Sequence, residues 1–186
     1  MPQLTAAFSV RKKSPLGIII KMKILSGGLS LKTITLTHYI VKDIAPSPWN
    51  KTWDNLVGFC TDMASKVAKT GFQLRARQSV LEELTEDNLM SGNLVTISAE
   101  EAGLPETPIE DILELELDFT ACPECRTPGG QEFPCRTFKN SEGEECQELP
   151  RDFFFEAVLR TAFKAKFGAD HCNGSCASCG GCEKEE

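Results

Sequence analysis

Eight of the nine cysteines in this 186-residue chain fall into two groups, both beyond residue 121. Thiolates coordinate zinc and other soft metal ions, and neighbouring thiols form and exchange disulfides. The spacing within each group therefore predicts metal binding or thiol redox chemistry. The first group is Cys122, Cys125, Cys135 and Cys146, and the second is Cys172, Cys176, Cys179 and Cys182.

The first group begins with a Cys-x2-Cys pair, Cys122 and Cys125, which can direct two sulfurs at one centre as tetrahedral zinc requires. The Thr-Pro-Gly-Gly sequence at residues 127–130 can reverse the chain and return Cys135 to this pair. A fourth thiolate from Cys146 would close the site. We therefore expect zinc or another soft metal here.

Charged neighbours affect both possible chemistries of this group. Arg126, Arg136 and Arg151 would offset the negative charge of metal-bound thiolates. Positive charge also lowers the pKa of a cysteine thiol and makes it a better nucleophile. The two glutamates before Cys146 have the opposite effect, which weighs against Cys146 as a ligand.

Three functions fit these observations. The leading hypothesis is a protein that binds zinc or another soft metal or metalloid through thiolates. The alternative is a thiol–disulfide oxidoreductase or metal(loid) reductase in which Cys122 and Cys125 react, together with a thiol redox partner protein. The third is an interaction domain that holds a structural zinc ion.

The second group lies in a segment, residues 171–186, whose cysteines are separated only by Gly, Ala, Ser and Asn. Such a segment has nothing to bury, so we expect a disordered tail that accepts or donates metal ions. Soft thiolates on a flexible backbone suit Zn(II), Cu(I), Hg(II) and As(III). An iron–sulfur cluster is less favoured, because these clusters usually need an apolar surrounding that the tail lacks.

The composition excludes several partners. Hydrophobic residues make up 41% and charged residues 25%, which is typical of a globular domain, and the net charge of −7 disfavours nucleic acids and anionic membranes. The apolar run at residues 16–20 is too short to span a membrane and is closed by lysines. We expect a flexible N-terminal extension at residues 1–23. We also expect the protein to be cytoplasmic, and thiols stay reduced in that compartment.

The remaining pattern predicts an α/β fold. Strands are expected at residues 32–41, 72–81, 93–98 and 115–120, a long helix between Pro48 and Gly71, and shorter helical segments at 82–90 and 105–113. A last helix at 150–167 carries an apolar stripe, including Leu159, Phe163 and Phe167, that we assign to the core. The order fits a thioredoxin-like sandwich over residues 24–170, with a cysteine hairpin inserted at 120–147.

Several other residues are assigned to packing rather than chemistry. Cys60 lies on the apolar face of the first long helix, and His38 lies inside the first strand. Trp49 and Trp53 also fall in this region. We expect all four side chains to serve the core.

A family resemblance rests on residues 80–84, 91–97 and 109–113, on Cys122-Pro-Glu-Cys125 and on Cys135-Arg-Thr. In these features the chain resembles an uncharacterised family of short, cysteine-rich, thioredoxin-like prokaryotic proteins, a domain of unknown function. Members often carry another Cys-x2-Cys just after the first strand, where thioredoxins hold their redox pair. This chain has Ser-Pro-Trp-Asn at residues 47–50 instead, so the resemblance implies the fold but no thioredoxin activity.

Overall fold

The computed structural model describes residues 19–20, 31–139 and 143–168. The predicted cysteine-rich tail and most of the predicted N-terminal extension lie outside these residues. In the part that is described, no helix is long and apolar enough to cross a membrane.

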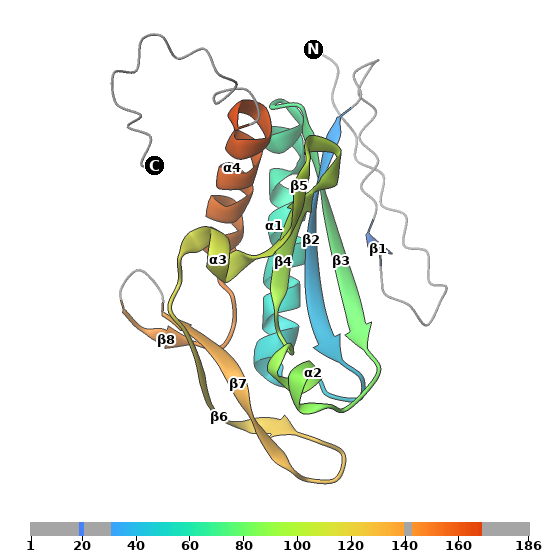
Figure 1. Cartoon of the computed structure of the whole chain (residues 1–186), viewed down its shortest axis with the longest axis vertical. Coiled ribbons are helices and arrows are strands. Elements are labelled where there is room, and N and C mark those ends of the chain that lie inside the picture. The colour runs from blue at the N-terminus through green and yellow to red at the C-terminus, as the bar shows by residue number, and fades with distance from the viewer. Residues whose placement is uncertain (1–18, 21–30, 140–142, 169–186) are drawn as a thin grey trace, which may run out of the picture.

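The main sheet has five strands in the order β1-β3-β2-β4-β5 (Figure 1). Its members are β1 (Ile19–Ile20), β2 (Lys32–Val41), β3 (Phe72–Leu81), β4 (Val95–Ala99) and β5 (Leu104–Pro108). β2 and β3 are parallel along their whole length, as expected for two strands joined by a helix. β4 runs antiparallel to β2, and β5 antiparallel to β4.

Two long helices build the core against this sheet. α1 (Ser47–Ala68) starts after Pro46 and has a proline in its first turn, where the missing N–H costs nothing. α4 (Arg151–Phe167) packs on α1, and the rings of Phe59 and Phe154 lie 6.0 Å apart. The apolar residues of both helices join one buried cluster with alternate residues of β2 and β3, including Ile34 and Leu74.

The helical segment expected at residues 105–113 is wrong in its first half. Residues 104–108 form β5, and α3 (Ile109–Leu113) begins only after Pro108. The two prolines of this stretch are tolerated because β5 is an edge strand, which needs N–H groups on one side only. The other short helix, α2 (Glu86–Met90), starts at Thr85, whose hydroxyl accepts the Asn88 N–H.

The expectation that the whole apolar stripe of the last helix belongs to the core is also wrong. Phe154, Ala157 and Val158 are buried, whereas Leu159 and Phe163 are more than half exposed. The sequence has apolar residues on both sides of this helix, and only one side can face the sheet.

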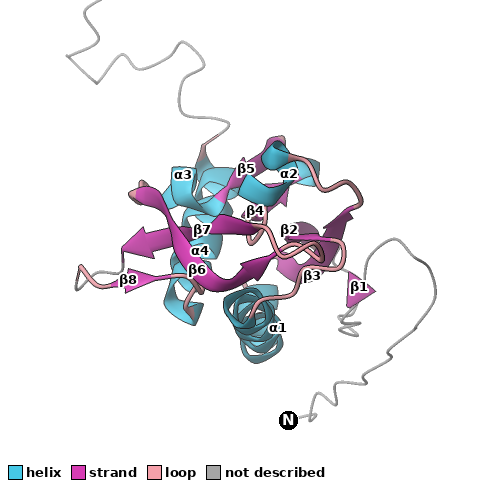
Figure 2. Ribbon diagram, turned by 90° about the horizontal axis from the view of Figure 1, so that it is seen from below, coloured by secondary structure: helices cyan, strands magenta, loops and turns pink. Residues whose placement is uncertain are grey.

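A second sheet is inserted between α3 and α4. It consists of β6 (Leu117–Arg126), β7 (Glu132–Lys139) and β8 (Glu145–Cys146), paired antiparallel in that order. Figure 2, viewed from below, shows β6 and β7 crossing the end of the molecule beside α1. The expected cysteine hairpin is therefore a twisted extension of the main domain.

His38 is a buried structural side chain, as expected. Its Nε2 lies 3.0 Å from Asn93 Oδ1, and its ring stacks on Trp53. Burial lowers the pKa of His38 from 6.5 to about 4, because a charged imidazolium would lose its hydration there.

This pKa predicts a pH-dependent stability. The unfolded chain takes up the proton near pH 6.5, whereas the folded chain resists it until about pH 4, so the stability present above pH 6.5 is lost as the pH falls. Between about pH 7.5 and 5 we expect His38 to account for about 2 kcal/mol of this loss. Urea unfolding of wild type and His38→Gln at both pH values tests this, and equal pH slopes would contradict it.

Candidate thiol site

Three cysteines of the hairpin meet in the interior. The Sγ atoms of Cys122, Cys125 and Cys135 all lie within 4.8 Å of one another, and each residue is at most 5% exposed. Two come from β6 and one from β7, as the hairpin prediction requires. Two sulfurs bound to one zinc ion lie about 3.8 Å apart, so small shifts would let the three share an ion.

An irregular stretch of β6 makes this convergence possible. Residues three apart in a regular strand point to opposite faces, so Cys122 and Cys125 could not both face inward there. Ala121 pairs with Pro134 and Arg126 with Glu132, so β6 advances by five residues while β7 advances by two. The extra residues form a bulge that turns both thiols to the same side.

The three cysteines are not all in the same oxidation state. Cys125 and Cys135 form a disulfide with a Cα–Cα distance of 6.7 Å, and Cys122 is a free, buried thiol. This pairing differs from the Cys122–Cys125 pair expected for a redox site. A free thiol beside a disulfide has the arrangement needed for exchange, and reduction of the disulfide would yield three thiols at one place.

The group packs where β2 ends and α1 begins. Its neighbours in this cluster include Val41, Ile44, Trp49 and Phe133, and the rings of Trp49 and Phe133 lie 6.2 Å apart. Trp49 is 1% exposed and serves as packing, as expected. The surroundings of the thiols are therefore mostly apolar.

Glu124, between the first two cysteines, connects the hairpin to α1. Its Oε2 accepts the backbone N–H of Ser47, the first residue of α1, at 2.7 Å. A carboxylate at this end of a helix is stabilised by the partial positive charge of the unpaired N–H groups. The contact holds the bulge of β6 over the start of α1.

A buried ion pair fixes the other side of the hairpin. Arg136, next to Cys135, donates to the carboxylate of Glu110 in α3 and, at 3.0 Å, to the carbonyl oxygen of Met90. The side chains of Arg136 and Glu110 are only 10% and 6% exposed. β7 is thereby tied to both α2 and α3.

Cys146 lies outside the group of three. It is on β8, opposite Phe138 of β7, which is three residues or about 10 Å along the strand from Cys135. Its Sγ donates to the Phe138 carbonyl oxygen at 3.5 Å, and burial followed by the charge of Glu148 raises its pKa. The structure thus brings together three of the four cysteines of the first group.

The other cysteines do not add to this site. Cys60 is a core residue of α1, as expected, and burial raises its pKa to about 12. Cys172, Cys176, Cys179 and Cys182 lie outside the described residues.

The arginines expected to balance the thiolate charge are paired with carboxylates. Arg126 contacts Glu132 at 2.6 Å and Arg151 contacts Asp62 at 2.8 Å, while Arg136 pairs with Glu110. Sequence proximity could not reveal these partners, two of which come from distant elements. The charge of thiolates at this site is therefore not neutralised by these side chains.

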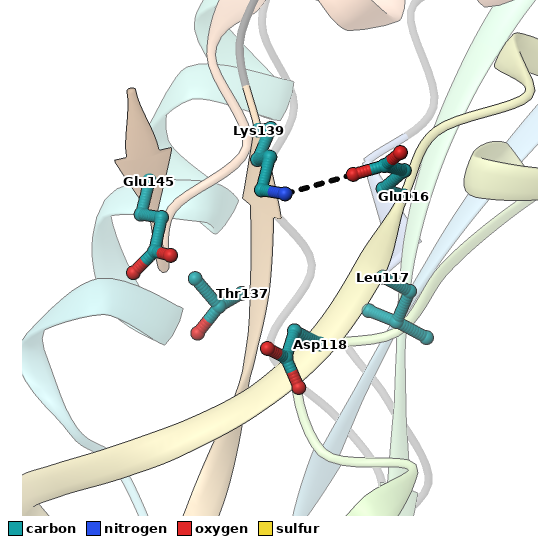
Figure 3. Close-up of a pocket in the computed structure, with 6 residues that line it drawn as sticks. All are labelled: Glu116, Leu117, Asp118, Thr137, Lys139 and Glu145. Atoms are coloured by element: carbon teal, nitrogen blue, oxygen red, sulfur yellow. Dashed lines mark hydrogen bonds and ion pairs between the residues drawn. The ribbon is translucent and has the colours of Figure 1, made fainter. Parts of the chain in front are cut away.

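A polar cavity that the sequence did not suggest lies at the opposite end of the hairpin strands. It holds about 310 Å³ and is lined by residues that include Glu116, Asp118, Lys139 and Glu145 (Figure 3). The Lys139 ammonium group contacts Glu116 at 2.8 Å, which raises the pKa of the lysine and lowers that of the glutamate. Because Lys139 already forms an ion pair with Glu116, this cavity is a weaker candidate for a ligand site than the cysteine cluster.

Residues 33–158 match the family described as a domain of unknown function, DUF2703. The chain belongs to the DUF2703 family. Comparisons with curated proteins and with solved structures found no match. The DUF2703 match covers all three clustered cysteines and ends inside α4, so the tail cysteines lie beyond it. The resemblance to a domain of unknown function, inferred from the sequence, is thereby confirmed.

Loss of one partner of the buried ion pair should destabilise the fold strongly. Arg136→Met leaves Glu110 as an uncompensated buried charge, which typically costs about 3–5 kcal/mol. Arg126→Met, which breaks the exposed pair with Glu132, should cost less than about 1 kcal/mol. Urea unfolding at pH 7 measures both, and equal losses would show that the buried pair does not hold the hairpin.

Proposed function

We propose that this protein binds a soft metal or metalloid ion through the thiolates of Cys122, Cys125 and Cys135. The observation that carries the proposal is the convergence of three buried sulfurs within 4.8 Å. Binding requires the Cys125–Cys135 disulfide to be reduced, which takes two electrons and two protons. A dithiol protein can supply them and become a disulfide itself. The proposal therefore calls for a reducing compartment such as the cytoplasm.

Charge and ligand number favour a trivalent metalloid such as As(III). Three thiolates neutralise As(III), whereas they leave Zn(II) with a net charge of −1 in a mostly apolar cluster. Zinc also prefers four ligands, and the described residues bring only three cysteines together. A zinc complex would thus need a water or a tail thiolate as its fourth ligand.

The tail cysteines complete the proposal as donors or acceptors of the ion. Four thiols separated by small residues can hold a soft ion weakly and in several geometries. The clustered thiols would then be the tighter, buried site. Transfer between the two occurs by stepwise exchange of one thiolate for another.

The topology supports a thioredoxin-like fold for the main domain. A parallel β2-α1-β3 unit is followed by an antiparallel β4–β5 pair and a helix, in the sheet order β3-β2-β4-β5. Thioredoxins hold their redox pair just after the first strand of this unit. Here that position is Ser-Pro-Trp-Asn, and the inserted hairpin lays its thiols against Trp49 at the same end of α1.

Ion titration tests the proposal. The full-length chain with its four tail cysteines changed to serine, reduced by a phosphine, should bind one As(III) per chain by native mass spectrometry. Cys122→Ser should weaken binding roughly tenfold or more, because one of three ligands is lost. Cys146→Ser is the matched control and should leave binding unchanged. Equal losses in the two variants, or no bound ion, would overturn the proposal.

A second function, thiol–disulfide exchange, is favoured by one observation. Cys122 lies beside the Cys125–Cys135 disulfide and can attack Cys125, which forms a Cys122–Cys125 disulfide and releases Cys135 as the thiolate. A protein client would have to reach sulfurs that are at most 5% exposed, which opposes this function.

A catalytic assay of disulfide reduction distinguishes metal binding from thiol–disulfide exchange. If metal binding is the function, the reduced chain should reduce a protein disulfide such as that of insulin no faster than the dithiol reductant alone. Catalysis that is lost in Cys122→Ser and retained in Cys146→Ser would instead establish the exchange reaction.

A further inference from the structure

One face of α4 is apolar and uncovered. Four of the five exposed large hydrophobic residues in the described part of the chain lie on this helix. They recur every four residues and form a stripe along its whole length. Their exposed fractions are Phe155 48%, Leu159 57%, Phe163 65% and Phe167 44%.

The stripe is separate from the face by which α4 joins the core. Phe154, Ala157, Val158 and Ala165 are buried against the sheet and α1. An amphipathic helix needs only one such face, and the opposite side is normally polar. Large apolar side chains aligned on the outer side therefore indicate a second contact.

The charges beside the stripe are divided along the helix. Asp152 lies near the N-terminal end of the helix and Lys166 near its C-terminal end, and a step of 100° per residue places both within the arc that the stripe covers. This order also suits the helix dipole, so by itself it requires no partner. Together with the stripe, however, it makes the face complementary to itself when a second copy is turned by 180°.

We propose that α4 pairs antiparallel with α4 of a second copy of this chain, about a two-fold axis near Leu159. Phe155 then faces Phe163 of the second copy, and Leu159 faces its own equivalent. Asp152 faces Lys166 of the second copy. A two-fold axis makes every such contact twice. A parallel pair would place like charges together, which opposes that arrangement.

Asp152 and Lys166 provide the electrostatic part of this match. Glu156 and Arg160 already form an ion pair within the helix at 2.5 Å, and Arg160 also donates to the carbonyl oxygen of Ile112 in α3. Among the described residues, no side chain forms an ion pair with Asp152 or Lys166. The pair of helices would give each of these two groups a partner.

The chain's own ends are poorer occupants. Residues 169–186 contain no Val, Ile, Leu, Met, Phe, Tyr or Trp and cannot cover an apolar stripe. Residues 1–18 precede β1, which lies at the edge of the sheet opposite β5, whereas α4 packs near β4. A second copy brings four large apolar side chains to meet four others.

The expected affinity of the dimer follows from the surface area that it would bury. The four side chains would bury roughly 400 Å² per copy, or about 800 Å² in total, which is less than a stable specific interface buries, so the dimer is a weak, transient one. We expect a dissociation constant in the micromolar range that rises with salt as the rim charges are screened.

Sedimentation velocity of the reduced, full-length chain with serine at the four tail cysteines tests the pairing. Dimerisation should appear between about 1 and 200 µM. Phe163→Glu should raise the dissociation constant roughly tenfold or more. Leu84→Glu, at an equally exposed leucine away from α4, is the control and should not change it. A wild-type monomer throughout this range, or equal effects of the two variants, would overturn the proposal.

Charge exchange tests the antiparallel register. Asp152→Lys and Lys166→Asp should each weaken the homodimer, because like charges then face each other. A mixture of the two variants should form a heterodimer, because both facing pairs become opposite in charge again. Simple damage to the helix would not be repaired by mixing, so failure of the mixture to associate contradicts the pairing. Circular dichroism verifies that each variant stays folded.

Discussion

The buried ion pair between Arg136 and Glu110 is the contact on which the arrangement of the thiols depends. It lies one residue from Cys135 and ties β7 to α3, while Glu124 ties β6 to the start of α1. A hairpin on the surface of a domain can twist freely unless both strands are held. Here both strands are held, and the sulfurs carried by β6 and β7 lie within 4.8 Å of one another.

The same pair shapes the electrostatics of the proposed site. Arg136 could have balanced a thiolate, but its charge is already compensated by Glu110 in the interior. Arg126 and Arg151 are likewise paired, so thiolates at this place depend on the bound ion itself for neutralisation. This requirement favours a highly charged, thiophilic ion and opposes an open site with free thiolates.

The proposed metal site and the proposed dimer interface come close to each other at the ends of α4. In an antiparallel pair, the C-terminal end of one α4 lies beside the N-terminal end of the other, and that end follows directly on β8 and the hairpin. The chain continues from Gly168 into the cysteine-rich segment, and Cys172 follows four residues later. In the proposed pair, Gly168 of one copy would thus lie near the start of α4 of the other.

The sequence by itself determined the longest elements of the main domain and the family. Alternation predicts β2 and β3, helical periodicity predicts α1 and α4, and the local cysteine and turn pattern predicts a hairpin, because these signals depend on neighbours in the chain. Only the tertiary structure decided which thiols meet, since the bulge in β6 and the place of β8 leave Cys146 about 10 Å along β7 from Cys135. It also decided the partners of the arginines and which face of α4 stays exposed. These outcomes depend on contacts between distant segments, and a local pattern carries no information about them.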